Sequence, residues 1–296
     1  MIHLNVTIDS TLVQHFRDDG WSGMEAAWTD LCRQYLVTDL SGFGDFFQCD
    51  QQPTLNELSL LDDTVCFLDS NLRQSIEHII RWVPEVDEDI FQTMTVVFLP
   101  YGKYTFSPKL GLQLFSLDPY ASPIETYLFL VHVYYHELSY LNETPNGRRC
   151  SSEQLSAEDF KEWIRLLIRN EGIGNYAILE ELIQFRDTRP DYVMRYFTYA
   201  RKIGDPALLQ SAVSILTNAF TAVDDVNVAQ FRGGINRIFK NEALPIINLV
   251  GIHMAESIAN HYDVATLKNV YQREAGDFFA LYGQTDAPFA KMLQGL

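Results

Sequence analysis

The chain has 296 residues, of which 47% are hydrophobic and 21% charged, and its formal net charge is −17. That length allows one large domain or two ordinary ones with a sizeable buried core. The composition is typical of a globular protein and excludes a disordered or fibrous chain. The excess of carboxylates argues against nucleic-acid or anionic-membrane partners, because both kinds of binding need basic patches.

Cysteine usage indicates a reducing compartment. The four cysteines are widely spaced, form no Cys-x-x-Cys pair and are too sparse for a disulfide framework. The start of the chain has no basic segment followed by an apolar run, as a signal peptide would. The longest apolar run, residues 127–135, is too short to span a bilayer. We therefore expect a soluble, cytoplasmic protein.

The first third of the chain is mainly helical in pattern. Residues 2–8 alternate apolar and polar side chains, which predicts a short strand. Helical spacing follows over residues 9–40, and a stretch with glycine and aspartate at 41–54 interrupts it. Apolar residues then recur at intervals of three and four over residues 55–82, which predicts one or two helices ending near Pro84.

Two strand-like runs precede a long buried helix. Residues 94–99 and 111–117 are rich in β-branched, aromatic and aliphatic side chains, with a turn signal between them, and predict a small sheet. Ser122, Pro123 and Glu125 then form the pattern of a capping box. The helix that they open should run to about Asn142, and it is apolar nearly all round, so we expect it to be central.

The remainder of the chain predicts further helices. A second capping signal at Ser156–Asp159 should open a helix that runs to Arg169, and helical spacing resumes after residues 170–176 and continues to Arg186. Further helices are expected near 190–202, 206–221, 225–239, 244–262, 264–273 and 275–283, with a short terminal one. We predict a predominantly helical α+β fold. We expect a mainly helical region at residues 1–92 and a metal-binding helical domain at residues 93–296. The two parts are separate domains or one continuous domain.

The long apolar helix carries two histidines four residues apart, His132 and His136. Residues i and i+4 are neighbours on a helix face, so both rings could bind one ion. A His-x-x-x-His pair commonly supplies two of the ligands of zinc. The alternative is two core histidines bonded to carbonyl or hydroxyl groups.

A mononuclear site needs a third protein ligand and an open position. The candidate is Glu171, in the sequence Glu-Gly-Ile-Gly, where small residues would let a second helix approach the histidine helix closely and bring the carboxylate to the two imidazoles. The alternative is that Gly172 and Gly174 end a helix and that Glu171 is solvated. The sequence leaves both interpretations open.

Taken together, the strand–turn–strand region, the histidine helix and the later Glu-Gly helix resemble gluzincin-like zinc peptidases. Residues 250–258 and 278–282, with Leu267 between them, look like the C-terminal helices of that family. The resemblance covers about residues 94–283, and it implies a zincin-like fold with a small sheet before the metal-binding helix.

The family motif His-Glu-x-x-His is incomplete in either alignment. With His136 as its first residue, Glu137 follows it but Tyr140 replaces the second histidine. With His132 first and His136 second, the catalytic glutamate is replaced by valine. The resemblance therefore implies His132, His136 and Glu171 as metal ligands, with Tyr140 as an alternative ligand.

Two other residues receive roles from the resemblance. Glu137 would be the general base that activates metal-bound water, although it lies one helical turn, about 6 Å, from the family's position. His253 lies in the matched C-terminal part and is either a donor to the transition state or a hydrogen-bonded core histidine.

Three functions are compatible with this set of residues. The first is a zinc-dependent hydrolase, peptidase-like, acting on a peptide or a small amide-containing substrate. The second is a non-haem enzyme that holds Fe(II) with two histidines and one carboxylate, for which a missing base is no handicap. The third is a zincin-derived binding protein without activity. The sequence does not specify the substrate or the oligomeric state.

Overall fold

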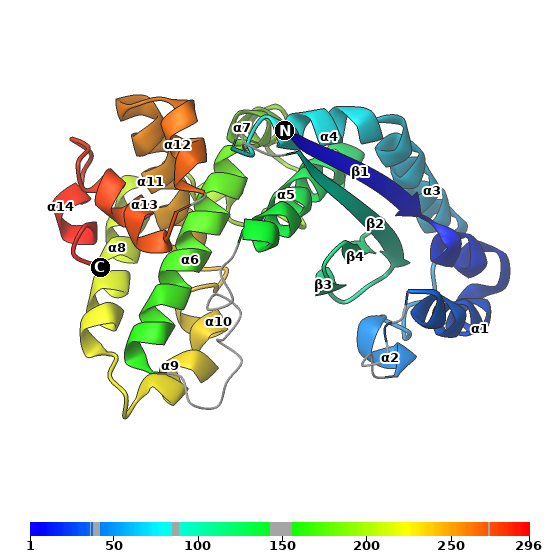
Figure 1. Cartoon of the computed structure of the whole chain (residues 1–296). Helices are drawn as coiled ribbons and strands as arrows, with labels where there is room; N and C mark the ends of the chain where they lie inside the picture. Colours follow the sequence, from blue (N-terminus) through cyan, green and yellow to red (C-terminus); the bar gives the residue numbers. More distant parts are fainter. Residues whose placement is uncertain (36, 38–41, 85–88, 143–155, 272) are drawn as a thin grey trace. The chain divides into compact units, whose positions relative to one another are not determined.

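The computed structural model describes the chain except for residues 36, 38–41, 85–88, 143–155 and 272, and the side chains of residues 140–142. The fold is α+β, mostly helical, with one four-stranded sheet (Figure 1), as predicted. The chain divides into two compact units. Unit 1 comprises residues 1–81, 85–137 and 193–197, and unit 2 comprises residues 82–84, 138–192 and 198–296.

The sheet of unit 1 is formed by β1 (Ile2–Asp9), β2 (Ile90–Pro100), β3 (Phe106–Lys109) and β4 (Leu112–Leu117), in the order β1-β2-β4-β3. Strands β1, β2 and β4 are parallel, whereas β3 is antiparallel to β4. After β2 the chain forms β3 at the edge of the sheet, and β4 then fills the position between β2 and β3. The domain boundary expected between residues 92 and 93 falls within β2.

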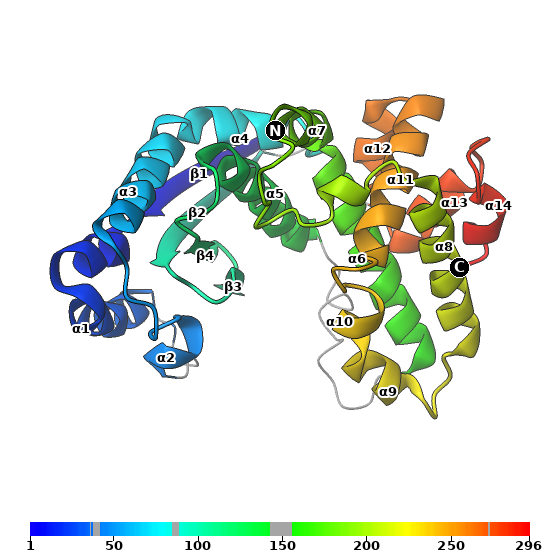
Figure 2. The same cartoon turned by 180° about the vertical axis from the view of Figure 1, so that it is seen from behind.

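Helices lie between β1 and β2 in the sequence of unit 1. They are α1 (Thr11–Gln34), α2 (Phe43–Phe46), α3 (Leu55–Ser70) and α4 (Leu72–Ile80). Helix α1 packs against β2 and α4 against β1, and both views place α4 beside β1 (Figure 2). Along β1 buried and exposed residues alternate, whereas β4 is buried throughout, as a strand with both faces covered should be.

Helix α5 (Pro123–Asn142) follows the sheet and has the predicted bounds. Glu125, in its first turn, is fully buried. Its Oε1 accepts hydrogen bonds from the backbone N–H groups of Arg195, Tyr196 and Phe197 at 2.7, 2.8 and 3.4 Å. Glu125 therefore fastens a distant segment within unit 1, a contact that the sequence pattern at Ser122 did not indicate.

Unit 2 is helical in the residues that the structure describes. Ser156 and Asp159 form the predicted capping box at its first helix, through N–H to side-chain hydrogen bonds of 3.1 and 3.3 Å. Its elements are α6 (Ala157–Tyr176), α7 (Leu179–Thr188), the 3₁₀ helix η2 (Ala200–Lys202), α8 (Pro206–Ala222), α9 (Val228–Gly233), α10 (Ile235–Ile238), α11 (Ile246–His261), α12 (Val264–Val270), α13 (Ala275–Tyr282) and α14 (Ala290–Leu293).

Two expectations for this region were wrong. Helix α6 continues through residues 170–176, where a break was expected, because its glycines are buried in the helix rather than ending it. Residues 190–199 are not helical, and only the short η2 forms at 200–202. Within the described part of the chain, no helix has the length and apolarity that crossing a membrane requires.

Helices α6 and α11 cross at two glycines, Gly172 and Gly251. A Cβ atom built on Gly172 would lie 2.5 Å from the carbonyl oxygen of Gly251, and one built on Gly251 would collide with the backbone of Ile168. The absence of side chains thus allows backbone-to-backbone contact. The glycines after Glu171 were expected to bring this helix close to the histidine helix, whereas the close crossing that they make is with α11.

We expect Gly251→Ala to lower the free energy of unfolding by about 2 kcal/mol, because the added methyl group has only backbone to displace. Urea unfolding followed by circular dichroism measures this change. The control is Gly276→Ala on α13, where an added Cβ meets nothing within 4 Å and stability should be unchanged or slightly raised. Equal stabilities for the two variants would contradict the packing argument.

Candidate metal centre

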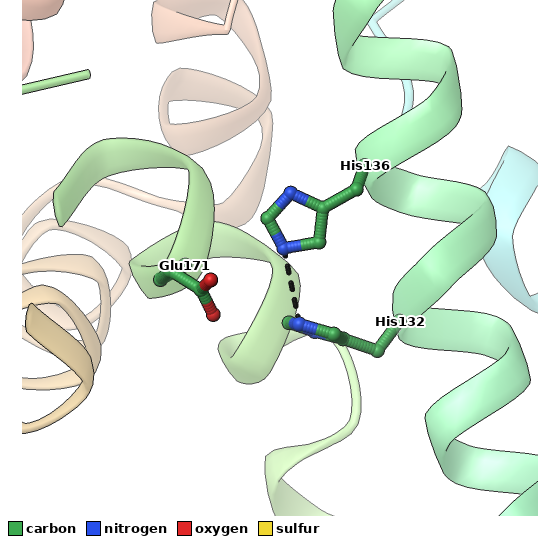
Figure 3. Close-up of side chains that lie close together, drawn as sticks. All are labelled: His132, His136 and Glu171. Carbon is green, nitrogen blue, oxygen red and sulfur yellow. Dashed lines mark hydrogen bonds between the residues drawn. The ribbon is translucent and has the colours of Figure 1, made fainter. Parts of the chain in front are cut away.

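The two histidines of α5 face the same point. His132 and His136 are one turn apart, their ring centroids lie 4.5 Å apart and the ring planes are inclined by 75°. Their Nε2 atoms are 3.0 Å apart (Figure 3). The helical spacing predicted from the sequence therefore brings one nitrogen of each ring to a common position.

The separation of the two nitrogens is compatible with ligation of one ion. Two nitrogens bound to zinc at tetrahedral angles lie about 3.3 Å apart, given the usual Zn–N distance. At right angles, as in octahedral coordination, the separation is about 2.9 Å. The observed 3.0 Å falls between these values. It is also a hydrogen-bond length, so without an ion one ring can donate to the other.

The surroundings of His132 are apolar. Its side chain is largely buried, Phe129 stacks on it with centroids 6.4 Å apart, and Phe197 meets it edge-on at 6.3 Å. Phe197 belongs to the segment that Glu125 holds. A ring nitrogen binds a metal ion in the neutral form of the imidazole.

Glu171 lies on α6, where two amide groups orient its carboxylate. Its Oε2 accepts hydrogen bonds from Asn175 Nδ2 at 3.3 Å and from Asn248 Nδ2 on α11 at 3.2 Å. The glycine crossing of α6 and α11 brings Asn248 within reach, since Gly251 lies one turn beyond it. Outer hydrogen bonds of this kind hold a ligating carboxylate in position.

The Tyr199 hydroxyl extends this network. It donates to Asn175 Oδ1, so the amide nitrogen of Asn175 is directed toward Glu171. Burial, reinforced by the charge of Glu171, raises the pKa of Tyr199 well above its ordinary value. The hydroxyl therefore stays protonated and acts as a donor. Sequence reasoning missed Asn248 and Tyr199, but Asn175 lies at the i+4 position from Glu171 and could have been noticed.

His132, His136 and Glu171 form a group that could hold a metal ion. Each offers one ligand atom, and the three atoms lie within 4.8 Å of one another (Figure 3). Two imidazoles and one carboxylate with an open position are the ligands of many catalytic zinc sites and also of non-haem Fe(II) sites. The donor set thus indicates a divalent transition metal without specifying which one.

Glu137, the proposed general base, is engaged with the sheet. It is 1% exposed, and its Oε1 accepts a hydrogen bond of 2.6 Å from the backbone N–H of Gly111. Gly111 directly precedes β4 and has a φ of 80°, which glycine adopts without strain. The contact fastens α5 to the sheet.

Tyr140 and His253 are the two remaining candidate site residues from the sequence. Tyr140 lies in α5, but its side chain is outside the described part of the structure. His253, on α11, contacts the Tyr282 hydroxyl through Nε2 at 2.9 Å and the Pro288 carbonyl at 3.4 Å. His253 is therefore a hydrogen-bonded, partly buried histidine of unit 2, in agreement with the simpler of its two interpretations.

Comparison with known proteins finds no match to a family model, to a curated protein or to a solved structure.

Burial lowers the pKa of His253 below its ordinary value of 6.5. The unfolded chain consequently binds a proton more readily than the folded one as the pH falls below 6.5. We expect the stability difference between wild type and His253→Gln to be fully present above pH 6.5 and to shrink as the pH falls through the folded-state pKa. Urea unfolding at several pH values measures it, with His78→Gln as the control. A difference that grows on acidification would contradict the sign of the shift.

Proposed function

We propose that the protein is a metal-dependent hydrolase that binds zinc through His132, His136 and Glu171. The observation that supports this proposal is the grouping of two imidazole nitrogens and one carboxylate oxygen. The sequence resemblance to gluzincin-like peptidases supports the choice of zinc and of a peptide or small amide as substrate. A bound zinc ion would polarise a carbonyl group and acidify a water molecule.

The residues of the chain have distinct roles in this proposal. His132 and His136 supply the two nitrogen ligands. Glu171 supplies the carboxylate, and the amides of Asn175 and Asn248 hold one of its oxygens. Because α6 and α11 fix both amides, the carboxylate is oriented before any ion binds, which reduces the entropy cost of ligation.

Glu137 is the proton acceptor in this proposal. Its carboxylate is buried and directly follows the ligand His136 in the sequence. Gly111 holds its Oε1, so a proton from water would go to Oε2 or would displace the hydrogen bond that Gly111 donates. Activity measurements must therefore decide whether Glu137 acts as the general base.

The hydrogen bond from Gly111 to Glu137 also supports a second candidate function. If Glu137 stays bound to Gly111, its role is structural and hydrolysis lacks a base beside the histidines. Two histidines and one carboxylate then suit an Fe(II) enzyme, whose chemistry needs open coordination positions rather than a general base. The bound metal distinguishes the two candidates.

We expect the purified protein to contain one equivalent of zinc per chain. Removing a ligand should weaken zinc binding by at least about 100-fold in His132→Ala, His136→Ala and Glu171→Gln, since an outer hydrogen-bonding partner alone is worth about 10- to 100-fold. Elemental analysis and competition with a chromophoric chelator measure content and affinity.

Asn248→Ala is a graded test of the same site. It removes one amide from Glu171 and should weaken zinc binding by about 10-fold, while the exposed Asn269→Ala should have no effect. Iron in place of zinc would support the second candidate. Protein that takes up neither metal would overturn both.

Glu137→Gln tests the general base. The amide oxygen of glutamine can still accept the hydrogen bond from Gly111, so the fold and the metal content should be retained. We expect hydrolysis of amide substrates to fall by at least about 100-fold, because general-base catalysis commonly contributes that much. Initial rates on a library of quenched fluorescent peptides measure the loss. Unchanged activity in the metal-loaded variant would limit Glu137 to its structural role.

A further inference from the structure

A cavity of about 550 Å³ opens in unit 1, and the residues proposed to bind metal are not among those that line it. It lies at the carboxyl ends of two neighbouring parallel strands. Residues 101–105 follow β2 and line one side, and residues 118–120 follow β4 and line another. Open sheets with parallel strands commonly bind ligands at this edge, because the chain must leave each strand there and turn away.

The third wall comes from the segment that Glu125 holds. Tyr196 stacks on Phe129 with centroids 4.5 Å apart and planes inclined by 9°. Its hydroxyl accepts a hydrogen bond from the N–H of Asp118 at 3.0 Å and donates one to the carbonyl of Ser116 at 3.1 Å. This wall is therefore positioned by directional bonds to α5 and β4.

The turn after β2 is strained in a way that shapes the cavity. Tyr101 has a φ of 52°, a conformation that few residues other than glycine adopt. Ser116 Oγ donates to the Gly102 carbonyl, and a Cβ built on Gly102 would lie 2.9 Å from Ser116 Oγ. Strain of this kind costs about 1–3 kcal/mol and is concentrated at functional sites.

Two opposite charges face each other in the cavity. Asp118 Oδ1 accepts a hydrogen bond of 2.8 Å from the N–H of Tyr120, while Asp118 Oδ2 lies 3.8 Å from Arg195 Nε. The Arg195 guanidinium lies over the Tyr120 ring at 5.5 Å. At 3.8 Å the two charges attract without a direct hydrogen bond, and both side chains keep substantial exposure, 32% and 44%.

We propose that this cavity binds a free α-amino acid with an aromatic side chain. An α-amino acid carries an ammonium and a carboxylate on one carbon, which matches an aspartate and an arginine that lie side by side. The planar guanidinium of Arg195 can take the carboxylate through two parallel hydrogen bonds, and Asp118 can accept from the ammonium. A purely anionic ligand would be repelled by Asp118.

The size and lining of the cavity agree with such a ligand. Small-molecule sites usually have volumes of about 300–1,000 Å³. Phe129 and the tyrosines at 101, 104, 120 and 196 surround the space with aromatic rings. Aromatic rings attract one another in offset or edge-to-face arrangements, so we expect the ligand's ring to lie among them. The proposal does not depend on the metal site.

Calorimetric titration of the full chain with three probes tests this proposal. The probes are L-phenylalanine, L-phenylalaninamide, which lacks the carboxylate, and N-acetyl-L-phenylalanine, which lacks the ammonium. We expect L-phenylalanine to bind and each analogue to bind at least about tenfold more weakly. The titration is repeated after chelator treatment, and affinity should be unchanged, so a failed metal site would not affect this result.

Two variants assign the contacts. Arg195→Gln should bind L-phenylalanine and its amide equally, and Asp118→Asn should bind L-phenylalanine and the N-acetyl compound equally. The exposed Arg33→Gln is the control and should keep the wild-type preferences. Each variant should also keep its preference for L-phenylalanine over the other analogue, whereas misfolding would remove both preferences. No binding of L-phenylalanine by the wild type, or equal affinity for all three probes, would overturn the proposal.

Discussion

The buried carboxylate of Glu125 accepts hydrogen bonds from three successive backbone N–H groups, those of residues 195–197. A charged group without water around it is costly unless it is well bonded, and these donors compensate that cost. In return, the segment adopts one position within unit 1. Phe197 then packs edge-on against His132. Arg195 and Tyr196 line the cavity at the carboxyl ends of β2 and β4.

Local sequence signals predicted the helices well. The histidine pair of α5 depends on the i, i+4 rule and on strong helical periodicity, both of which act over a few residues. The capping box at Ser156 is confirmed for the same reason. In the similar pattern at Ser122, Glu125 bonds to residues about seventy positions later. No local pattern predicts such a distant contact.

The sheet was predicted only in part, because strand pairing is decided at long range. The runs at 94–99 and 111–117 are strands, and they pair with each other in parallel. The strand between them in sequence, β3, pairs with β4 at the edge of the sheet. The short β3 contains a proline, so its sequence gives a weak strand signal. At the candidate metal centre, His132, His136 and Glu171 were predicted from the sequence, whereas Asn248 depends on the crossing of α6 and α11. The hydrogen bond from Gly111 to Glu137 likewise depends on how α5 lies on the sheet.

The participation of residues 193–197 in unit 1 has a consequence for synthesis. The ribosome delivers β1, the helices that follow it, the rest of the sheet and α5 long before it delivers this segment. Until then Glu125 lacks its three backbone donors and must stay hydrated or protonated. Pairing β1 with β2 already closes a long loop, which slows folding. Unit 1 can therefore reach its final structure only after about two thirds of the chain has been made, and the nascent form is the stage most exposed to proteases and chaperones.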